Sequence, residues 1–410
     1  MKFSEYHFAD EIKENIDKIG YKKPTDIQYK AIPNILRGED LLAIAQTGTG
    51  KTAAFALPIL HILHTSHNTK RADGIKCVVM VPTRELAIQI NGVFTHLGRG
   101  TRVTSFSVFG GVEQAPQIAK LEKGIDILIS TPGRLFDLVH QGYIHLHRVK
   151  ILVLDEADHM LDRGFIKDIR DLIKFLPKKR QTLFFSATID DDIKKLAYSL
   201  VTNPIRIQVS PKDPVSKNVD HSVLYVKMDD KRFFLERLAN ENPDKKILIF
   251  ARTKVRAERV HAAMHRVDIQ SVVMHGDKDQ KDRLQALNTF KLGNVQMMIA
   301  TDVTARGIDI PDVDFVVNYD IPEHPENYVH RVGRTGRGKN RGIAYSFCDD
   351  SERDMLASIE DYIGKKIKIL SIDVLDYNEV KDLSVEKPIQ LKDILSAFEK
   401  PMKKKGKKKN

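Results

Sequence analysis

Short runs of apolar residues alternate along this chain with segments whose apolar residues recur at helical spacing. The runs hold few polar residues and are rich in Ile, Val, Leu and Phe, which is typical of strands buried on both faces of a parallel sheet. Alternation of such strands with helices predicts a parallel α/β fold. The expected strands are 41–45, 78–81, 125–129, 151–154 and 183–185 in the first half, and 247–250, 271–274, 297–300, 315–318 and 343–347 in the second.

A turn-rich stretch separates the two series of strands. Residues 209–217 read Val-Ser-Pro-Lys-Asp-Pro-Val-Ser-Lys, a composition that favours a linker over a helix or strand. We therefore expect a first domain at residues 1–208, a linker at 209–219 and a second domain at 220–365. The remaining residues, 366–410, form a mixed and charged extension with a lysine-rich tail, which we expect to be disordered.

Composition narrows the class of protein. The 410 residues are 42% hydrophobic, so each domain has enough apolar side chains for a normal core. The two cysteines, Cys77 and Cys348, lack metal-ligand spacing, which argues against a disulfide scaffold or a zinc site and fits a reducing cytoplasm. The N-terminus has no apolar signal-peptide core, and no apolar run reaches about 18 residues, so we expect a cytoplasmic protein without a membrane span.

The chain is basic, with a formal net charge of +11. Six of these charges are the lysines between Lys403 and Lys409, which leaves the other five to the body of the chain. Such a balance fits a polyanionic partner, but ordinary surface solvation explains it as well.

A glycine-rich segment between an expected strand and an expected helix fits a phosphate-binding loop. Gly48 and Gly50 let the backbone turn its N–H groups toward phosphate oxygens, and the helix that follows adds its N-terminal dipole. Lys51 supplies a positive charge to the terminal phosphates, and the Thr52 hydroxyl can reach magnesium. A plain glycine turn is a poor alternative in this context, although Ala45 stands where the general pattern has glycine. The expected loop residues are Ala45, Gln46, Thr47, Gly48, Thr49, Gly50, Lys51 and Thr52.

Three carboxylates follow the expected strand 151–154 within four positions: Asp155, Glu156 and Asp158. Carboxylates at the end of a buried strand are costly unless a cation is held against them. By itself this segment could be a solvated turn, but together with the phosphate loop it predicts a magnesium–nucleotide site. We expect Asp155, directly or through a water, and Thr52 to hold the metal, and Glu156 to act on the attacking water.

The order of these and further motifs resembles the DEAD-box RNA helicases of superfamily 2, and most of all their bacterial RhlE-like branch. The resemblance covers about residues 3–365. It implies two tandem RecA-like domains with parallel sheets, RNA-stimulated ATP hydrolysis with ATP and Mg²⁺, and RNA as the partner. Ala45 in the loop is the family's usual form. We expect a monomer, while the sequence leaves its protein partners unknown.

Residues 20–28, Gly-Tyr-Lys-Lys-Pro-Thr-Asp-Ile-Gln, resemble the family's adenine-reading Q motif. The resemblance implies that the isolated aromatic residue Phe3 stacks on adenine and that the Gln28 amide reads its edge with one donor and one acceptor. Tyr21 and Lys23 are implied to belong to the same site. Without the resemblance, Phe3 reads as a disordered terminal residue and Gln28 as a helix-surface residue.

Motifs that follow strands in both domains resemble the family's RNA contacts. Their arginines can pair with phosphates and their glycines allow close backbone approach, although any one motif alone would read as the start of a capped helix. The implied RNA-binding residues are Arg84, Gly110, Gly111, Thr131 and Arg134 in the first domain, and Arg252, Gln280, Arg283, Thr301 and Asp302 in the second.

Residues 330–337 carry arginines at every third position, so these side chains could share one helical face. An exposed basic helix would explain the spacing alone. The resemblance implies that Arg334 and Arg337 are arginine fingers, which stabilise charge on the transferring phosphate. It also implies that Asp309 reaches the nucleotide ribose. The residues implied to couple the site to domain closure are Asp158, Ser186, Thr188 and His330, although Ser186-Ala187-Thr188 alone could be a simple turn or cap.

These roles imply an ATP-dependent RNA helicase that acts in ribosome assembly or RNA remodelling. ATP and RNA both favour the closed form, and bending of one RNA strand opens a few base pairs. RNA is held mainly through phosphate and sugar, so recognition is largely independent of sequence. Two alternatives remain: an ATP-gated RNA clamp with little unwinding, and a DNA-directed translocase, against which the Q motif and the Asp-Glu-Ala-Asp spelling argue. The lysine tail either tethers RNA or is simply solvated.

Overall fold

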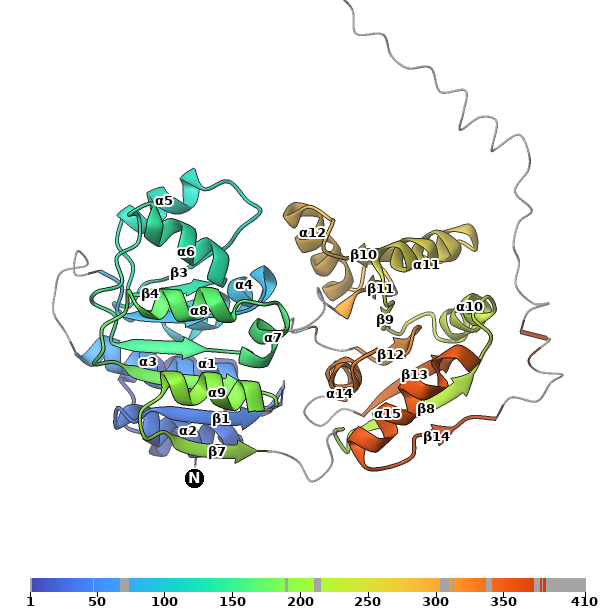
Figure 1. The fold of residues 1–410 in the computed structure, drawn as a ribbon, viewed down its shortest axis with the longest axis horizontal. Helices are drawn as coiled ribbons and strands as arrows, with labels where there is room; N and C mark the ends of the chain where they lie inside the picture. The colour runs from blue at the N-terminus through green and yellow to red at the C-terminus, as the bar shows by residue number, and fades with distance from the viewer. Residues whose placement is uncertain are drawn as a thin grey trace, which may run out of the picture.

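The computed structural model describes residues 2–46, 48–66, 74–188, 191–209, 215–302, 310, 313–336, 341–371, 377, 379 and 380. These residues form two α/β lobes, which lie side by side (Figure 1). Each lobe contains a 7-stranded sheet in which every neighbouring pair of strands is parallel. The predicted α/β class with two parallel sheets is therefore confirmed.

The sheet of lobe one is buried on both faces. Successive side chains of a strand point to opposite faces, so Leu41 and Ala43 belong to one core and Leu42 and Ile44 to the other. The order of the strands in the sheet is β3 (Ser105–Val108), β4 (Ile127–Ser130), β2 (Cys77–Met80), β5 (Ile151–Leu154), β6 (Gln181–Ser186), β1 (Leu41–Ala45) and β7 (Ile205–Val209).

Helices cover the two faces of this sheet in sequence order. The face that receives Leu41 is covered by η1 (Phe3–Glu5), α1 (Asp10–Ile19), α2 (Asp26–Leu36), α3 (Lys51–Thr65) and α4 (Arg84–Leu97). The other face is covered by α5 (Ala115–Glu122), α6 (Pro132–His140), α7 (Ala157–Asp162), α8 (Ile166–Ile173) and α9 (Asp191–Leu200).

Lobe two repeats this three-layer plan. Its sheet order is β10 (Ser271–Met274), β11 (Met297–Ala300), β9 (Ile247–Phe250), β12 (Phe315–Asn318), β13 (Gly342–Cys348), β8 (Val219–Tyr225) and β14 (Lys368–Ile369). One face packs against α10 (Lys231–Glu241) and α11 (Lys254–Arg266). The other packs against α12 (Gln280–Lys291), α14 (Pro325–Val332) and α15 (Arg353–Ile363), with η3 (Asp350–Glu352) leading into α15. No helix in the described parts of either lobe is long and apolar enough to cross a bilayer.

Every strand that the apolar runs predict is present, with boundaries that shift by a few residues. The runs fail to predict β3, β7, β8 and β14, of which all but β8 lie at a sheet edge. Edge strands are covered less completely, so their sequences alternate polar and apolar residues instead of forming a continuous apolar run. The Ile-Arg-Ile-Gln-Val sequence of β7 is an example.

The predicted linker and C-terminal extension are described only in part. Strand β7 ends at Val209 and β8 begins at Val219, and residues 210–214 between them lie outside the described residues. In the extension, residues 372–376, 378 and 381–410 also lie outside them, and these include the lysine-rich tail. The domain boundaries and the disorder of the tail stay predictions.

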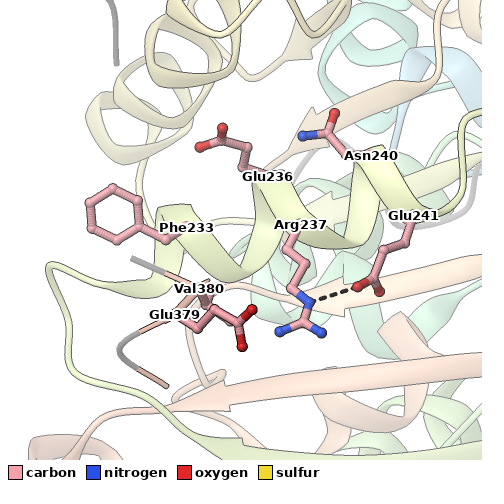
Figure 2. Close-up of a pocket in the computed structure, with 7 residues that line it drawn as sticks. All are labelled: Phe233, Glu236, Arg237, Asn240, Glu241, Glu379 and Val380. Atoms are coloured by element: carbon pink, nitrogen blue, oxygen red, sulfur yellow. Dashed lines mark hydrogen bonds and ion pairs between the residues drawn. The ribbon is translucent and has the colours of Figure 1, made fainter. Parts of the chain in front are cut away.

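A pocket of about 240 Å³ lies on lobe two beside α10 (Figure 2). It is lined by Phe233 and Arg237 of the helix, where Arg237 Nε lies 2.6 Å from Glu241 Oε1, and by Glu379 and Val380. None of the predicted site residues lines it, so this pocket is separate from the predicted nucleotide and RNA sites.

Each lobe buries one cysteine in a strand, and this offers a test of the fold. Burial raises the pKa of the Cys348 thiol in β13 to about 11 and also raises that of Cys77 in β2. At pH 8 a thiol of ordinary pKa is about one-quarter thiolate, whereas a thiol of pKa about 11 is roughly one-thousandth thiolate. We expect both thiols to resist alkylation at pH 8 in the folded protein and to react rapidly in concentrated urea.

Mass spectrometry of the two cysteine peptides at graded urea concentrations would follow the opening of each lobe separately. The fully unfolded chain supplies the reference rate for each thiol. Rapid labelling of Cys77 or Cys348 without urea would contradict the burial of the corresponding strand.

Candidate nucleotide and RNA site

The phosphate loop connects β1 to α3, as predicted. Gly48 and Gly50 have φ of 81° and 93°, a left-handed conformation that glycine adopts without strain. Lys51 opens α3 with only 6% of its surface exposed, and its Nζ has no hydrogen-bond partner among the described residues. A buried ammonium group without an acceptor needs an anion, and a phosphate would supply one. The described loop residues are Ala45, Gln46, Gly48, Thr49, Gly50, Lys51 and Thr52, and Thr47 lies outside them.

Gln28 joins the Q motif to the end of the phosphate loop. Its Nε2 donates to the Gly50 carbonyl oxygen at 3.1 Å, and its Oε1 accepts from the Thr25 N–H at 2.9 Å. A Cβ at position 50 would lie 2.6 Å from Gln28 Nε2, so only glycine fits there. The Q motif therefore contacts the backbone that precedes Lys51.

The aromatic residues of the Q motif pack together. Phe3 is 3% exposed, and its ring centroid lies 5.9 Å from that of Tyr21. Tyr21 and Lys23 are exposed. The interpretation of Phe3 as a disordered terminal residue is wrong, because the ring is part of the lobe-one core. The interpretation of Gln28 as a helix-surface residue is also wrong, because it is 4% exposed.

The three predicted carboxylates after β5 are all buried, with Asp155, Glu156 and Asp158 at 3%, 4% and 7% exposed. Burial raises the pKa of Asp155 to about 6, even though Lys51 acts to lower it. A bound divalent cation would stabilise the ionised form of a carboxyl group in this environment. Thr52 is half-buried in the first turn of α3, and its role as a second oxygen ligand of Mg²⁺ stays a prediction.

Mg²⁺ needs few protein ligands in a nucleotide site, because phosphates and waters supply the rest. Among the described residues, no group of three or more His, Cys, Asp or Glu side chains is arranged to hold a metal ion.

Glu156 is held in an unusual backbone conformation. Its φ of 54° and ψ of 50° are left-handed, which is rare for a residue with a Cβ and is found mainly where the surrounding structure imposes it. Its N–H donates to Asp155 Oδ1 at 3.0 Å, and His159 Nδ1 lies 3.1 Å from its Oε2. These contacts fix the direction of the Glu156 side chain.

Asp158 binds the segment that follows β6. Its Oδ2 accepts from the N–H groups of Ala187 and Thr188 at 3.0 and 3.2 Å, and from Thr188 Oγ1 at 3.4 Å. Ser186 Oγ is buried with no hydrogen-bond partner among the described residues. The predicted link between Asp158 and Ser186-Ala187-Thr188 thus exists as a direct contact, and its role in lobe closure stays a prediction.

Groups of lobe two come close to these acids of lobe one. The His159 and His330 ring centroids are 4.9 Å apart, and α7 and α14, which carry them, face each other (Figure 1). Burial alone would raise the pKa of Glu156, but the hydrogen bond from His159 and nearby positive charges, including Arg334, lower it to about 2. Arg334 therefore acts on the site of lobe one although it belongs to lobe two.

The arginines of residues 330–337 do not share one helical face. Arg331 lies in the last turn of α14 and is 1% exposed. Arg334 follows the end of the helix, and its Nε donates back to the His330 carbonyl oxygen at 3.1 Å. The expectation from the spacing is wrong because the helix ends at Val332, so the period of three no longer corresponds to helical turns. Arg337 lies outside the described residues.

Arg331 was not predicted as a site residue, yet it fixes the motif that follows β11. Its Nε and Nη2 bind the two carboxylate oxygens of Asp302 at 2.6 and 2.7 Å. Thr301 is buried, and its N–H donates to a β10 carbonyl oxygen at 3.3 Å. Asp309 lies outside the described residues. The RNA contacts of Thr301 and Asp302 and the ribose contact of Asp309 stay predictions.

The predicted RNA contacts of lobe one gather around Arg84. Gly111 has φ of +74°, and a Cβ there would collide with the Arg84 guanidinium, while a Cβ on Gly110 would lie 3.8 Å from it. Thr131 directly precedes α6, and its side chain makes no capping hydrogen bond. Arg134, in the first turn of that helix, donates to a backbone carbonyl at 3.3 Å, and its Nη1 is buried with no described partner. The cluster offers cationic donors beside accessible backbone, as phosphate binding requires.

Glu85 of lobe one contacts two residues of lobe two. Its Oε1 accepts from Gln280 Nε2 at 3.0 Å, and its Oε2 lies 2.8 Å from Arg283 Nη2. Arg84 Nη1 also donates to Gln280 Oε1, at 3.5 Å. The sequence predicted Gln280 and Arg283 as RNA contacts and did not single out Glu85, because an acid in the first turn of a helix is commonplace. The role of Glu85 is visible only in the structure, where it contacts Gln280, a residue 195 positions away in the sequence.

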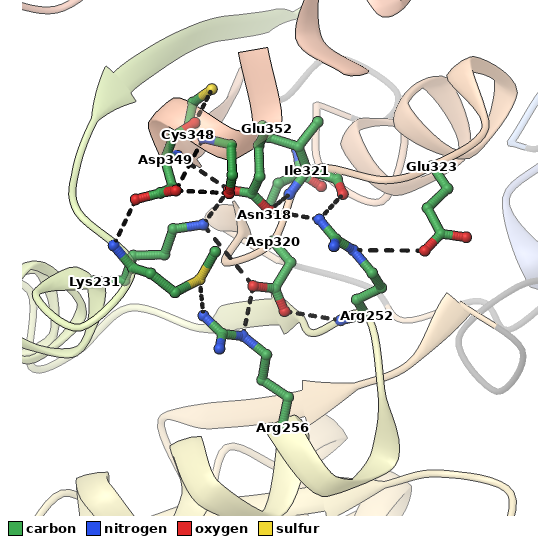
Figure 3. Close-up of polar contacts among 12 residues, drawn as sticks. Lys231, Arg252, Arg256, Asn318, Asp320, Ile321, Glu323, Cys348, Asp349 and Glu352 are labelled. Carbon is green, nitrogen blue, oxygen red and sulfur yellow. Dashed lines mark hydrogen bonds and ion pairs between the residues drawn. The ribbon is translucent and has the colours of Figure 1, made fainter. Parts of the chain in front are cut away.

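Arg252, another predicted RNA contact, belongs to an ion cluster inside lobe two (Figure 3). Its Nη2 lies 2.6 Å from Glu352 Oε1, and Lys231 Nζ lies 2.5 Å from the other oxygen of the same carboxylate. Arg256 Nε lies 2.6 Å from Asp320 Oδ1. Lys231, Asp320 and Glu352 are almost completely buried. The cluster joins the ends of β9, β12 and β13, and an RNA contact by Arg252 stays a prediction.

The geometry defines a class of protein. Two parallel α/β lobes meet where the acids that follow β5 in one lobe face His330 of the other. A phosphate-binding loop in one lobe and arginines in the other are the arrangement expected of a two-lobed, nucleotide-driven helicase.

Comparisons with known proteins give the family. The models of the DEAD/DEAH box helicase and of the helicase conserved C-terminal domain match residues 25–196 and 230–339. The DEAD-box ATP-dependent RNA helicase RhpA of Helicobacter pylori is 36% identical over 378 residues, which are 92% of this chain and 76% of that protein. The chain therefore belongs to the DEAD-box family of ATP-dependent RNA helicases, and its lobes are tandem RecA-like domains. Its place in the RhlE-like branch stays a prediction.

Solved structures of a yeast relative also match. S. cerevisiae Dbp5 bound to RNA and ADP BeF3 is 30% identical and matches with a TM-score of 0.82, covering 93% of this chain and 98% of that one. A Dbp5 variant bound to nup159, gle1, ip6 and ADP is 28% identical and matches with a TM-score of 0.62, covering 92% and 99%.

The contact between Glu85 and Arg283 leads to a prediction about closure of the two lobes. Replacing Arg283 with Met leaves the Glu85 carboxylate buried beside Gln280 alone, and an uncompensated buried charge is strongly unfavourable. We expect RNA affinity with a non-hydrolysable ATP analogue to fall by roughly tenfold to a hundredfold. ATP affinity without RNA should stay within about twofold, since the closed form is then little populated. Fluorescence anisotropy with labelled RNA and a labelled nucleotide measures both.

A double-mutant cycle with Glu85→Gln separates this role from direct RNA contact. If the pair acts across the lobes, the double variant should lose less than the sum of the single variants. Arg237→Met, at an exposed ion pair of lobe two, is the matched control. Additive losses would mean that Arg283 acts on RNA independently of Glu85.

Proposed function

We propose that this chain uses ATP to close its two lobes on RNA and to separate short duplexes locally. ATP is held by lobe one between the Q motif and the phosphate loop, and RNA is held across both lobes. The observation that carries the proposal is the contact between His330 of lobe two and His159 of lobe one, whose ring centroids are 4.9 Å apart, with Arg334 Nε bonded to the His330 carbonyl oxygen at 3.1 Å. A cation from one lobe beside the acids of the other makes hydrolysis depend on closure.

Four side chains of lobe one have separate roles in ATP hydrolysis. Lys51, whose buried ammonium group lacks a described acceptor, binds the terminal phosphates. Asp155, directly or through a water, and Thr52 would hold Mg²⁺, which when bound neutralises phosphate charge. Glu156, fixed by its backbone conformation and its hydrogen bonds, orients or deprotonates the attacking water. Adenine recognition is assigned to the Q motif as a whole, because Gln28 of that motif contacts the Gly50 carbonyl oxygen of the phosphate loop.

RNA binding relies on the cationic groups around Arg84 together with the motifs of lobe two. Arg134 supports this, because its Nη1 is buried with no described partner and a phosphate would satisfy it. Such contacts read the backbone and not the bases, so affinity should depend on salt more than on sequence. The lobe arrangement supports the same proposal, since it matches Dbp5 bound to RNA better than Dbp5 bound to nup159, gle1 and ip6.

Closure couples the two ligands. ATP and RNA each contact both lobes only in the closed form, so each raises the affinity for the other by the same factor. Among the described residues, the contacts between the lobes are polar or aromatic, which suits an interface that must open in every cycle. One chain supplies all parts of the site, so we propose that the monomer in the cytoplasm is the active form.

Removal of the arginine finger tests the proposal. A finger arginine contributes about 10³- to 10⁵-fold to the rate in other NTPases. We expect Arg334→Ala to lower RNA-stimulated ATP turnover by at least about a thousandfold, with ATP affinity of lobe one little changed. Phosphate release in a steady-state assay measures turnover. Arg237→Ala is the control, and wild-type turnover of Arg334→Ala would remove Arg334 from the mechanism.

A second assay distinguishes unwinding of RNA from ATP-gated RNA binding with little unwinding. Local opening of a few base pairs leaves a short duplex too unstable to persist, since each step of stacking contributes only about 1.4 kcal/mol. We expect ATP-dependent separation of a short RNA duplex and little separation of a long one, and no comparable stimulation by DNA of matched sequence. Tight RNA binding with an ATP analogue but no separation of either duplex would favour the clamp instead.

A further inference from the structure

His159 lies between the two lobes at the proposed catalytic centre. It lies in the last turn of the short helix α7 and is 3% exposed. One side of its ring contacts Glu156, with His159 Nδ1 3.1 Å from Glu156 Oε2. The ring also contacts His330 of lobe two, with centroids 4.9 Å apart and the ring planes inclined at 59°. His159 therefore touches the proposed water-activating residue and the opposite lobe at once.

The direction of the first contact follows from its chemistry. An ionised carboxylate can only accept hydrogen bonds, so His159 Nδ1 must carry the proton that points at Glu156. A hydrogen bond to a charged group is stronger than one between neutral groups, and here both partners are buried. The bond therefore restrains the Glu156 carboxylate, which would otherwise turn about its side-chain torsions.

The second contact connects this restraint to the arginine finger. The carbonyl oxygen of His330 accepts from Arg334 Nε at 3.1 Å. A continuous set of contacts thus runs from Glu156 through His159 and His330 to Arg334. Because the first two residues belong to lobe one and the last two to lobe two, the set is complete only when the lobes meet.

The arrangement is poorly explained by stability alone. The Nε2 of His159 is buried and has no hydrogen-bond partner among the described residues. A buried polar atom without a partner costs stability, so packing of the ring alone does not account for a histidine at this position. What an apolar ring could not do is donate to Glu156.

We propose that His159 is a positioning residue for ATP hydrolysis, which holds the Glu156 carboxylate in its working direction and completes that restraint against His330 when the lobes close. The proposal rests on the proposed role of Glu156 in activating water. His159 itself touches neither ATP nor water in this scheme and acts through Glu156.

Two substitutions separate the two contacts. His159→Asn keeps an N–H donor near the position of Nδ1 and loses the rest of the ring. His159→Phe keeps a ring against His330 and loses the donor. His96→Phe, at an exposed histidine of α4, is the matched control.

We expect His159→Phe to lower kcat for RNA-stimulated hydrolysis by roughly tenfold to a hundredfold, because a hydrogen bond to a charged group is lost. Its KM for ATP and its RNA affinity with a non-hydrolysable ATP analogue should stay within about threefold of wild type. His159→Asn should retain kcat within about threefold at saturating RNA, and its RNA affinity with the analogue should fall severalfold because the ring contact is gone. His96→Phe should change none of these values.

The opposite results would overturn the proposal. Wild-type kcat in His159→Phe would show that the hydrogen bond is dispensable. Equal losses of kcat in the Phe and Asn variants, with equal losses of thermal stability, would show a purely structural role. Thermal unfolding of each variant therefore accompanies the kinetics.

Glu156→Gln distinguishes failure of this inference from failure of the proposed function. It should abolish hydrolysis and keep ATP-dependent RNA binding. If Glu156→Gln is inactive while His159→Phe is fully active, only the role of His159 is wrong. If Glu156→Gln hydrolyses ATP normally, the proposed role of Glu156 is wrong, and the role of His159 fails with it.

Discussion

Buried carboxylates at the junction of the lobes impose the constraint on which the rest of the site depends. Asp155, Glu156 and Asp158 cannot stay ionised in the protein interior unless cations or N–H groups face them. Lobe one supplies part of this compensation through Lys51, and lobe two supplies more through Arg334. A bound divalent cation would offset the remaining negative charge, which agrees with the proposed role of Asp155 in holding Mg²⁺.

The same constraint explains how the lobes can meet and part. Each of the four apolar clusters of the described residues lies within a single lobe, so no shared core joins lobe one to lobe two. The described contacts across the junction are instead polar or aromatic, such as Glu85 with Arg283 and His159 with His330. Contacts of this kind depend on direction and on charge, and a bound nucleotide and RNA change both. Such an interface suits the ligand-dependent closure proposed above, whereas a large apolar interface would keep the lobes closed without ligands.

Much of the fold could be predicted because parallel strands buried on both faces leave continuous apolar runs in the sequence. The central strands β1, β5 and β9 were found in this way at their observed bounds. The edge strands β3 and β7 were missed because partial exposure breaks the run. At the site, the phosphate loop and the acids after β5 were recognisable because their chemistry requires particular residues at fixed local spacing.

The sequence by itself determined the strands buried on both faces of the sheets and the phosphate-binding turn, because these depend on interactions between near neighbours. The tertiary structure decided which charges meet. It buried Phe3 and Gln28 against lobe one, turned Arg331 onto Asp302, and paired Arg283 with Glu85 in the other lobe. The three acids that looked alike in the sequence also separated here: Asp158 bonds to the segment after β6, and Glu156 bonds to His159. Such pairings depend on how whole sheets are placed, and local spacing carries no information about contacts made across nearly half the chain.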